Sequence, residues 1–299
     1  KPIIAHHSAV LDPLAGLGTD HPLITDTELD RLQDDYVHAA ALAAQAGFDG
    51  VDVKACHGYL VSDLMAAFTR QKSRYGGSLE NRTRLLREVV ARIRDEVPGI
   101  LVTSRINGFD GIRRPYGFGT DEGDPPAPDL SEPVELGRKL DSLGCPMLNV
   151  SAGNPYYRPY HGRPFDRPIA GGAVPDEHPL IGIARLVRMT GQLQRAVPSL
   201  PMVGTGYSWL RQFFPQVGAA VIRAGKAAFI GLGRMGFAYP DAVADLAEHG
   251  ALDAKKVCIT CSSCSQIMRD GGRAGCIVRD PEVYVPEYRR GRRRAAADE

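Results

Sequence analysis

Length, composition and charge describe an ordinary globular chain. It has 299 residues, of which 43% are hydrophobic and 24% are charged, and its formal net charge is +1. This balance gives no electrostatic reason to expect a nucleic acid or a membrane surface as partner. No apolar run reaches the roughly 18 residues that a membrane span needs, and the first residues do not resemble a signal peptide. We therefore expect a cytoplasmic protein that contacts neither nucleic acid nor membrane.

Helical and strand-like segments alternate from about residue 25 to residue 247. Thr25 and Glu28 predict a capping box that opens a helix, and Gly47 is expected to end that helix. Ser78 and Ser131 are predicted to cap two more helices. Further helices are expected near 181–197, 212–224 and 240–249. Five buried strands are predicted at 48–53, 100–103, 147–150, 202–203 and 228–230.

This alternation implies a parallel sheet covered by helices. Doubly wound sheets and β/α barrels both fit such a pattern. Five strands are too few to close a barrel, which needs eight. The basic tail at 289–294 is expected to be a frayed, solvated terminus.

Four of the six cysteines are bunched near the end of the chain, at Cys258, Cys261, Cys264 and Cys276. In a chain without a secretory signal, such bunching predicts metal ligation rather than disulfides. Three ligands at two-residue gaps and a fourth from a loop favour a 4Fe-4S cluster. Structural zinc and no metal remain the alternatives at this point.

Candidate reactive side chains follow the first two predicted strands. In parallel barrels such residues gather at the carboxyl ends of the strands. Lys54, His57 and Tyr59 lie there, and each can donate a hydrogen bond to a substrate carbonyl. Arg105 ends the next strand and could stabilise negative charge on a reduced flavin. A structural histidine and a salt bridge of Arg105 are the simpler readings of the same residues.

Glycines follow the last two predicted strands, at Gly204 and Gly206 and then at Gly233, which precedes Arg234. Loops in these positions of a barrel commonly bind phosphate, because glycine lets backbone N–H groups approach and arginine neutralises charge. The paired pattern predicts a phosphate site.

Two motifs resemble the old yellow enzyme family of NADH:flavin oxidoreductases. They are Lys54-Ala-Cys-His-Gly-Tyr-Leu60 and Tyr75-Gly-Gly-Ser-Leu-Glu-Asn-Arg82, of which the second is the more specific. The cysteine spacing resembles the iron–sulfur branch that contains 2,4-dienoyl-CoA reductase and trimethylamine dehydrogenase. The resemblance runs from about His21 to Cys276.

The resemblance implies a (β/α)8 TIM barrel that binds FMN and transfers hydride through the flavin. By the same resemblance His57 takes the second position of the family's polar pair, and Lys54 replaces the His or Tyr of the first. Arg105 matches the flavin-contacting arginine, and Tyr156 falls near a proton donor, with Tyr157 as an equal candidate. Gly204, Gly206, Gly233 and Arg234 match the phosphate cradle.

The five predicted strands correspond to strands 4–8 of the family's barrel. We expect a fragment truncated at its N-terminal side, or a chain whose barrel another chain or a second copy completes. The expected organisation is a barrel portion over 1–250 and a four-cysteine segment with the basic tail over 251–299. The chain has no dinucleotide-binding glycine fingerprint, so its electrons are expected to come from NAD(P)H directly or from an electron-transfer protein.

Three functions remain open from the sequence. The first is an FMN-dependent ene-reductase that uses NAD(P)H to reduce an activated C=C bond of a small molecule, with the 4Fe-4S cluster carrying single electrons. The second is an amine dehydrogenase of the trimethylamine dehydrogenase type. The third is a non-catalytic fragment or subunit with a structural four-cysteine metal site.

Overall fold

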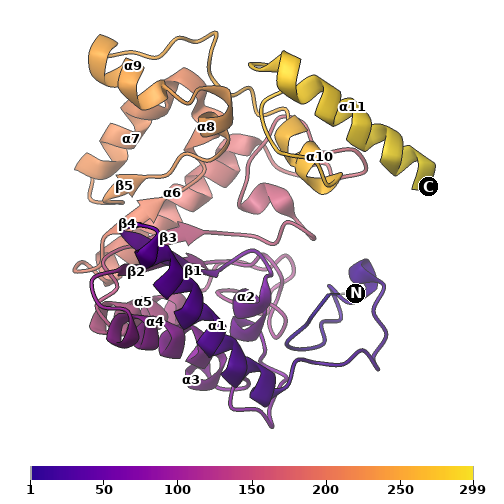
Figure 1. Ribbon diagram of the computed structural model, residues 1–299, viewed down its shortest axis with the longest axis vertical. Helices are drawn as coiled ribbons and strands as arrows, with labels where there is room; N and C mark the ends of the chain where they lie inside the picture. The colour runs from indigo at the N-terminus through magenta and orange to yellow at the C-terminus, as the bar shows by residue number, and fades with distance from the viewer. Residues whose placement is uncertain (1, 299) are drawn as a thin grey trace. The chain divides into compact units, whose positions relative to one another are not determined.

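The computed structural model describes residues 2–298, which divide into two compact units (Figure 1). Of the described residues, the first unit comprises 2–162, 185–205 and 225–229, and the second comprises 163–184, 206–224 and 230–298. The predicted organisation, with a boundary at residue 250, stays a prediction. No helix among the described residues is long and apolar enough to cross a membrane.

A five-stranded sheet with strand order β1-β2-β3-β4-β5 organises the first unit. The pairs β1–β2, β2–β3 and β3–β4 are parallel, so the predicted α/β fold with a parallel sheet is confirmed. Within residues 2–298 the two edge strands are β1 and β5. The strands are β1 (Gly50–Ala55), β2 (Leu101–Asn107), β3 (Leu148–Ser151), β4 (Met202–Gly204) and β5 (Phe229–Ile230).

The helices of the first part of the chain alternate with these strands as predicted. Helices α1, α2 and α4 contact β1 or β2, and α4 also contacts α1 and α5. The elements are η1 (Pro13–Ala15), α1 (Asp26–Gln45), α2 (Leu60–Met65), α3 (Leu79–Arg82), α4 (Arg84–Glu96), α5 (Ser131–Ser142), η2 (Pro159–His161) and α6 (Pro179–Ala196).

Local capping follows the sequence closely at α1 and less closely elsewhere. Thr25 and Glu28 form the predicted capping box. Ser78 does cap a helix, but that helix is only the four-residue α3, and α4 begins separately. The prediction for Ser131 is wrong, because it is the first residue of α5 and its backbone N–H donates to the Asp129 carboxylate at 3.0 Å. Aspartate accepts such a bond readily, so it serves here in place of the serine.

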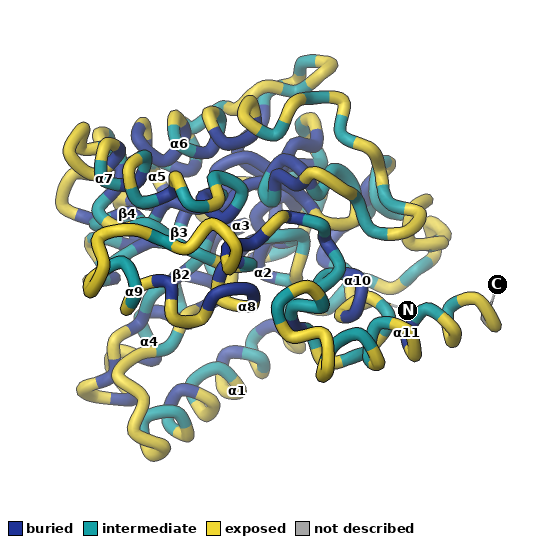
Figure 2. The backbone as a smooth tube through the Cα atoms, turned by 90° about the horizontal axis from the view of Figure 1, so that it is seen from above, coloured by how far each residue is buried: buried dark blue, intermediate teal, exposed yellow. Residues whose placement is uncertain are grey.

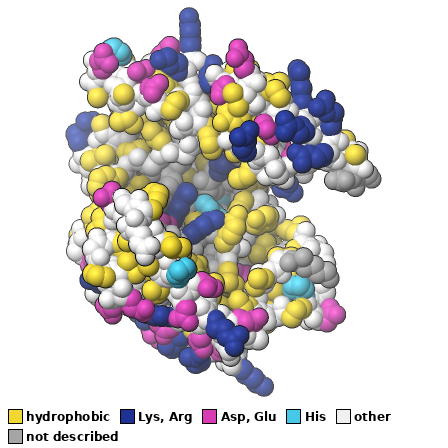
Figure 3. Space-filling view, viewed as in Figure 1, with side chains coloured by type: hydrophobic (Ala, Val, Ile, Leu, Met, Phe, Trp, Pro, Cys, Tyr) yellow, Lys and Arg dark blue, Asp and Glu magenta, His cyan; other side chains and the backbone are white. Residues whose placement is uncertain are grey.

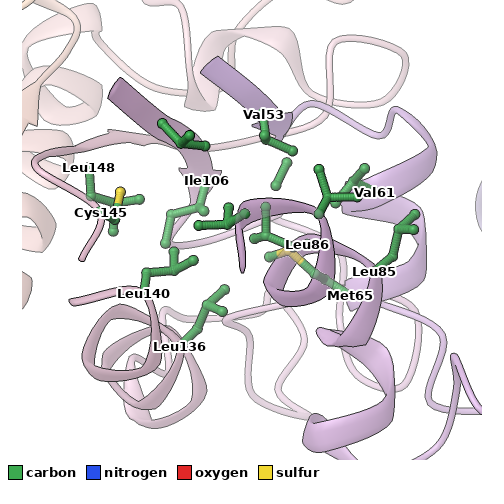
Figure 4. Packing of buried hydrophobic residues seen from close by; sticks show 14 of the residues in the cluster. Val53, Val61, Met65, Leu85, Leu86, Ile106, Leu136, Leu140, Cys145 and Leu148 are labelled. Atoms are coloured by element: carbon green, nitrogen blue, oxygen red, sulfur yellow. The ribbon is translucent and has the colours of Figure 1, made fainter. Parts of the chain in front are cut away.

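The core lies between the sheet and the helices that cover one of its faces. Alternate residues of β1 and β2, among them Val53 and Ile106, point into it. Figure 4 shows Val53, Ile106 and Leu148 directed toward apolar side chains of the helices. The middle strands β2, β3 and β4 consist mostly of buried and half-buried residues (Figure 2). The labelled helix residues of this cluster are Val61, Met65, Leu85, Leu86, Leu136 and Leu140.

The most specific family motif has a structural role here. Arg82 is 2% exposed, and its guanidinium donates to the Met65 and Gly77 carbonyls and pairs with Glu132 at 2.6 Å. A Cβ on Gly76 would lie 2.2 Å from the Arg70 carbonyl oxygen, so only glycine fits at that position. A buried arginine is tolerated when its donors are paired in this way.

The opposite face of the sheet carries polar side chains. Lys54, Arg105 and Asn149 are in register on β1, β2 and β3. They alternate with the core residues, as the two-residue period of strands requires. Lys54 is exposed, and the other two are partly buried. We call Lys54, Arg105 and Asn149 the open-face row.

The second unit is mainly helical and contains the cysteine segment. Its elements are η3 (Tyr207–Phe213), α7 (Phe214–Arg223), α8 (Arg234–Ala238), α9 (Ala242–His249), α10 (Ser263–Arg269) and α11 (Pro281–Asp298). The expectation of a frayed basic tail is wrong, because these arginines belong to α11, where Figure 3 shows basic side chains gathered. Gly291 is buried against Asp270, and Arg292 pairs with the same carboxylate at 3.5 Å, so α11 packs on α10.

Candidate functional site

The end of β1 presents three of the predicted site residues close together. Lys54 places its ammonium 3.1 Å from the centroid of the Tyr59 ring, a cation–π geometry. His57 lies between them in the chain and adopts φ 66°, a left-handed conformation that only Gly accepts without cost. Strained residues of this kind are concentrated at functional sites, because the surrounding structure has to hold them in place.

His57 and Arg105 share one hydrogen-bond partner, Ser151 at the end of β3. His57 Nε2 lies 2.7 Å from Ser151 Oγ, and Arg105 Nη2 donates to the same oxygen at 3.3 Å. The carboxyl ends of three adjacent strands therefore meet through a single hydroxyl. Of the described residues, no carboxylate forms an ion pair with Lys54 or Arg105.

Burial and, to a smaller extent, nearby positive charges lower the pKa of His57. Burial lowers the pKa of His57 to about 3, and the charges of Arg105 and Lys54 act in the same direction. His57 is therefore a neutral imidazole at physiological pH. The adjacent Cys56 is fully buried, and burial raises the pKa of its thiol to about 11, so it is not a reactive thiolate.

Tyr156 lies beside the same group of residues. Its ring centroid is 6.5 Å from that of Tyr59, and both rings are at least half exposed. Asn154 holds this loop in place: its Oδ1 accepts from the Tyr156 backbone N–H at 2.9 Å, and its amide packs on Gly58, where a Cβ would come within 2.4 Å. The structure thus gathers Lys54, His57, Tyr59, Arg105 and Tyr156 at one end of the sheet.

Sequence reasoning missed two polar residues of this site. Ser151 joins His57 to Arg105, and Asn149 completes the open-face row with an Oδ1 that is buried and without a hydrogen-bond partner. A signal was present, because both residues alternate with the apolar Leu148 and Val150 of the predicted third strand. Such alternation directs Asn149 and Ser151 away from the neighbouring apolar side chains.

All four predicted cysteine ligands line one pocket of the second unit, together with Arg234. The loop that carries them has two non-glycine residues with left-handed backbone, Thr260 (φ 51°) and Ser262 (φ 60°). Thr260 N–H donates to Cys258 Sγ at 3.4 Å, a bond of the kind that stabilises ligating sulfur. The hydroxyl of Ser262 is buried without a partner. Unpaired buried polar groups beside strained backbone indicate a functional site.

Two arginines add positive charge beside these sulfurs. Arg234 Nη2 donates to the Pro164 carbonyl at 2.7 Å, whereas its Nη1 is buried without a partner. Burial lowers the pKa of Arg234 to about 10, and the nearby charge of Arg163 acts in the same direction. Arg163 donates to Ser265 Oγ in α10. An unpartnered donor in a cysteine-lined pocket suits a cluster of net negative charge.

Residues 2–298 contain no preformed site for a single metal ion. No group of three or more His, Cys, Asp or Glu side chains is placed to hold one ion. What the described residues show is that the four cysteines share one pocket.

The predicted phosphate residues are placed at strand and helix ends. Gly204 ends β4, Gly206 has φ 99°, and Gly233 precedes α8. A Cβ on Gly233 would meet nothing within 4 Å, so the chain itself leaves this backbone accessible. Whether these residues bind phosphate stays a prediction.

Comparison with known proteins supports the likeness seen in the motifs. The sequence model of the NADH:flavin oxidoreductase / NADH oxidase family matches residues 15–120. The predicted resemblance is confirmed. An NADH oxidase of Thermoanaerobacter brockii is 27% identical over 256 residues, which are 84% of this chain and 34% of that protein. The chain thus spans about a third of the length of this curated relative.

Solved structures agree on the fold. A 2-naphthoyl-CoA reductase superposes with a TM-score of 0.65 at 21% identity, covering 89% of this chain and 36% of that one. Histamine dehydrogenase from Rhizobium sp. 4-9 gives 0.62 at 22% identity, covering 87% and 34%. An old yellow enzyme homologue from Zymomonas mobilis gives 0.55 at 22% identity, covering 78% and 56%. The predicted barrel-type fold, represented here by five strands, is therefore confirmed.

Proposed function

We propose that this protein is an FMN-dependent oxidoreductase that uses NAD(P)H to reduce an activated C=C bond of a small molecule. One observation carries the proposal: Arg105, His57 and Ser151 are joined by hydrogen bonds at the carboxyl ends of three parallel strands. Reactive groups of parallel barrels lie at that end. The likeness to NADH:flavin oxidoreductases over residues 15–120 supports the same reading.

The residues at the strand ends fit a flavin. Arg105 Nε is buried and has no hydrogen-bond partner, and the same is true of Asn149 Oδ1. A donor and an acceptor left unsatisfied on one face of the sheet are what a heterocycle with both kinds of polar atom would satisfy. Bound FMN would supply hydride to the substrate, and Arg105 would stabilise negative charge on its reduced ring. Gly204, Gly206, Gly233 and Arg234 are the proposed phosphate ligands.

His57 is the proposed hydrogen-bond donor to the substrate carbonyl. Ser151 Oγ accepts from Arg105, which leaves the serine proton available to His57 Nε2. With Nε2 as acceptor, the neutral ring carries its proton on Nδ1 and can donate it to a substrate. Tyr156, at the same end of the sheet, is the proposed source of the proton that completes the reduction.

We further propose that Cys258, Cys261, Cys264 and Cys276 bind a 4Fe-4S cluster. The common pocket, the Thr260 N–H to sulfur bond and the unpartnered Arg234 Nη1 support it. Such a cluster carries single electrons and would connect the flavin to an electron-transfer protein.

Amine oxidation is the second candidate, since histamine dehydrogenase has the same fold. The charges around His57 disfavour it, because an ammonium substrate would be repelled by Lys54 and Arg105. The third candidate, a purely structural four-cysteine site, requires zinc or no metal in place of iron.

The absorbance spectrum of the protein, purified without oxygen, separates these candidates. Ene-reduction predicts flavin absorbance that NADH or NADPH bleaches and an enone restores. Bleaching by an amine alone would favour the dehydrogenase. Metal analysis tests whether the cysteines bind an iron–sulfur cluster. We expect about four irons and four acid-labile sulfides per chain by the ligand rules of such clusters. Zinc in place of iron would refute the proposed cluster.

A further inference from the structure

Lys54 has an ammonium group that no described residue neutralises. It is exposed at the end of β1, and the contact that positions it is the face of the Tyr59 ring. The nearest acid on the same face of the strand is Asp52, two residues earlier and hence about 6–7 Å along the chain. Asp52 accepts a hydrogen bond from Thr103 Oγ1 at 2.9 Å. Among the described residues, Asp52 therefore forms no ion pair with Lys54.

The cross-strand neighbour of Lys54 makes its position still less favourable. Lys54 is in register with Arg105 on β2. Like charges directly opposite one another on adjacent strands destabilise a sheet, and here both are cations. Arg105 and His57 are also held by Ser151, so neither can turn away freely. An arrangement that costs stability in the free protein becomes favourable once an anion binds between the two charges.

Two exposed aromatic rings lie near one another here, and one of them, Tyr59, contacts the ammonium group. Tyr59 and Tyr156 are 50% and 60% exposed, with ring centroids 6.5 Å apart and planes tilted by 55°. Exposed tyrosine rings offer apolar area to a flat, conjugated molecule at small entropic cost. The same position thus combines a cation that forms no ion pair with a described residue and surfaces for an unsaturated carbon skeleton.

We propose that Lys54 binds a carboxylate of the substrate, so that the protein acts on unsaturated compounds that carry a negative charge. Lys54 would be a specificity-determining residue, with His57 left to bind the carbonyl of the reacting C=C system. This inference rests on the proposed function, since it names the substrate class of the same site. It also explains why lysine stands where the family resemblance implies His or Tyr, because neither of those carries a fixed positive charge at neutral pH.

Binding of benzoate and benzamide to the protein tests the inference, because the two probes match in shape and differ in charge. Isothermal titration calorimetry should show benzoate binding about tenfold more tightly than benzamide at low ionic strength. Lys54→Met should reduce that ratio about tenfold, and Lys54→Arg should largely retain it. Lys72→Met, which removes another exposed lysine, is the matched control and should leave the ratio unchanged.

Two results would overturn the inference: equal binding of the two probes by the unaltered protein, or an unchanged ratio in Lys54→Met. Both can be read independently of the proposed function. A protein that holds FMN but shows no benzoate preference refutes only the substrate class. A protein that prefers benzoate through Lys54 but takes up no FMN refutes the flavin reaction and retains the anion site.

Discussion

A single hydroxyl group connects two residues of the proposed active site. Ser151 Oγ bonds both His57 and Arg105, so it holds the imidazole and the guanidinium in place together. Ser151→Ala should lower kcat/KM for the enone about tenfold or more, because two partners lose their bond at once. The control is Ser142→Ala, at an exposed serine whose hydroxyl donates to the Lys139 carbonyl at 2.8 Å. Equal activity of the two variants would show that Ser151 does not contribute to the site.

The same histidine makes stability depend on pH. The pKa of His57 falls from its usual 6.5 to about 3 in the folded protein, so the unfolded chain binds the extra proton more readily. Its contribution to stability is therefore complete above pH 6.5 and is lost as the pH falls from there toward 3. His57→Asn should lose less stability between pH 7 and pH 4 than the unaltered protein, by on the order of 2 kcal/mol.

Denaturant unfolding at the two pH values measures this difference. His38→Asn is the matched control, since His38 is an exposed histidine on α1. It should follow the unaltered protein at both pH values. An acid sensitivity of His57→Asn as large as that of the unaltered protein would mean that His57 is not held neutral.

Most of the individual site residues could be predicted from the sequence, and the exceptions have a physical reason. Lys54, His57 and Arg105 follow apolar strands, so strand-end reasoning found them. The alternation of apolar and polar residues directs Ser151 away from the core, but its hydrogen bonds to His57 and Arg105 depend on the tertiary structure and cannot be predicted from the sequence. The unfavourable charge pair of Lys54 and Arg105 likewise depends on strand register, which the sequence does not specify.

At the scale of elements, the cysteine segment depends on close packing beneath α11. A Cβ on Gly275 would lie 2.1 Å from the Tyr284 ring, so this glycine allows the helix to press on the residue next to Cys276. Gly275→Ala should displace that loop, lower the iron content and destabilise the protein by roughly 1–3 kcal/mol. The matched control is Gly236→Ala in α8, where a Cβ meets nothing within 4 Å and alanine favours the helix.

Iron analysis and thermal unfolding of the two variants test this prediction. Loss of iron only in Gly275→Ala is the expected result. Normal iron content in that variant would show that the contact with Tyr284 does not position Cys276.

The helices and strands could be predicted where the spacing of apolar residues and the capping or turn residues indicated the same element. All five strands and the capping box of α1 follow from such patterns. Helix α11 did not, because its sequence is rich in arginine and contains Pro286, so periodicity gives no sign of it. Helix α11 buries Gly291 against Asp270. This tertiary packing stabilises the helix although its sequence has only a weak helical preference.

At the scale of the whole molecule, the five described strands form an open sheet rather than a closed barrel. β1 is an edge strand, and its outer hydrogen-bonding groups have no strand partner among residues 2–298. Unpaired edges invite pairing with further strands. The earlier expectation that more chain or a second copy completes the barrel stays a prediction, as does the partner protein that would receive electrons from the cluster.

Flavin binding at the strand ends is tested by the flavin spectrum of this protein compared with that of Arg105→Met, both purified without oxygen. The unaltered protein should show FMN absorbance that NADH or NADPH bleaches and an enone restores. Arg105→Met should retain less flavin or reoxidise more slowly, because the reduced ring loses its neutralising partner. A preparation of the unaltered protein that neither contains nor takes up FMN would refute the proposed flavin reaction.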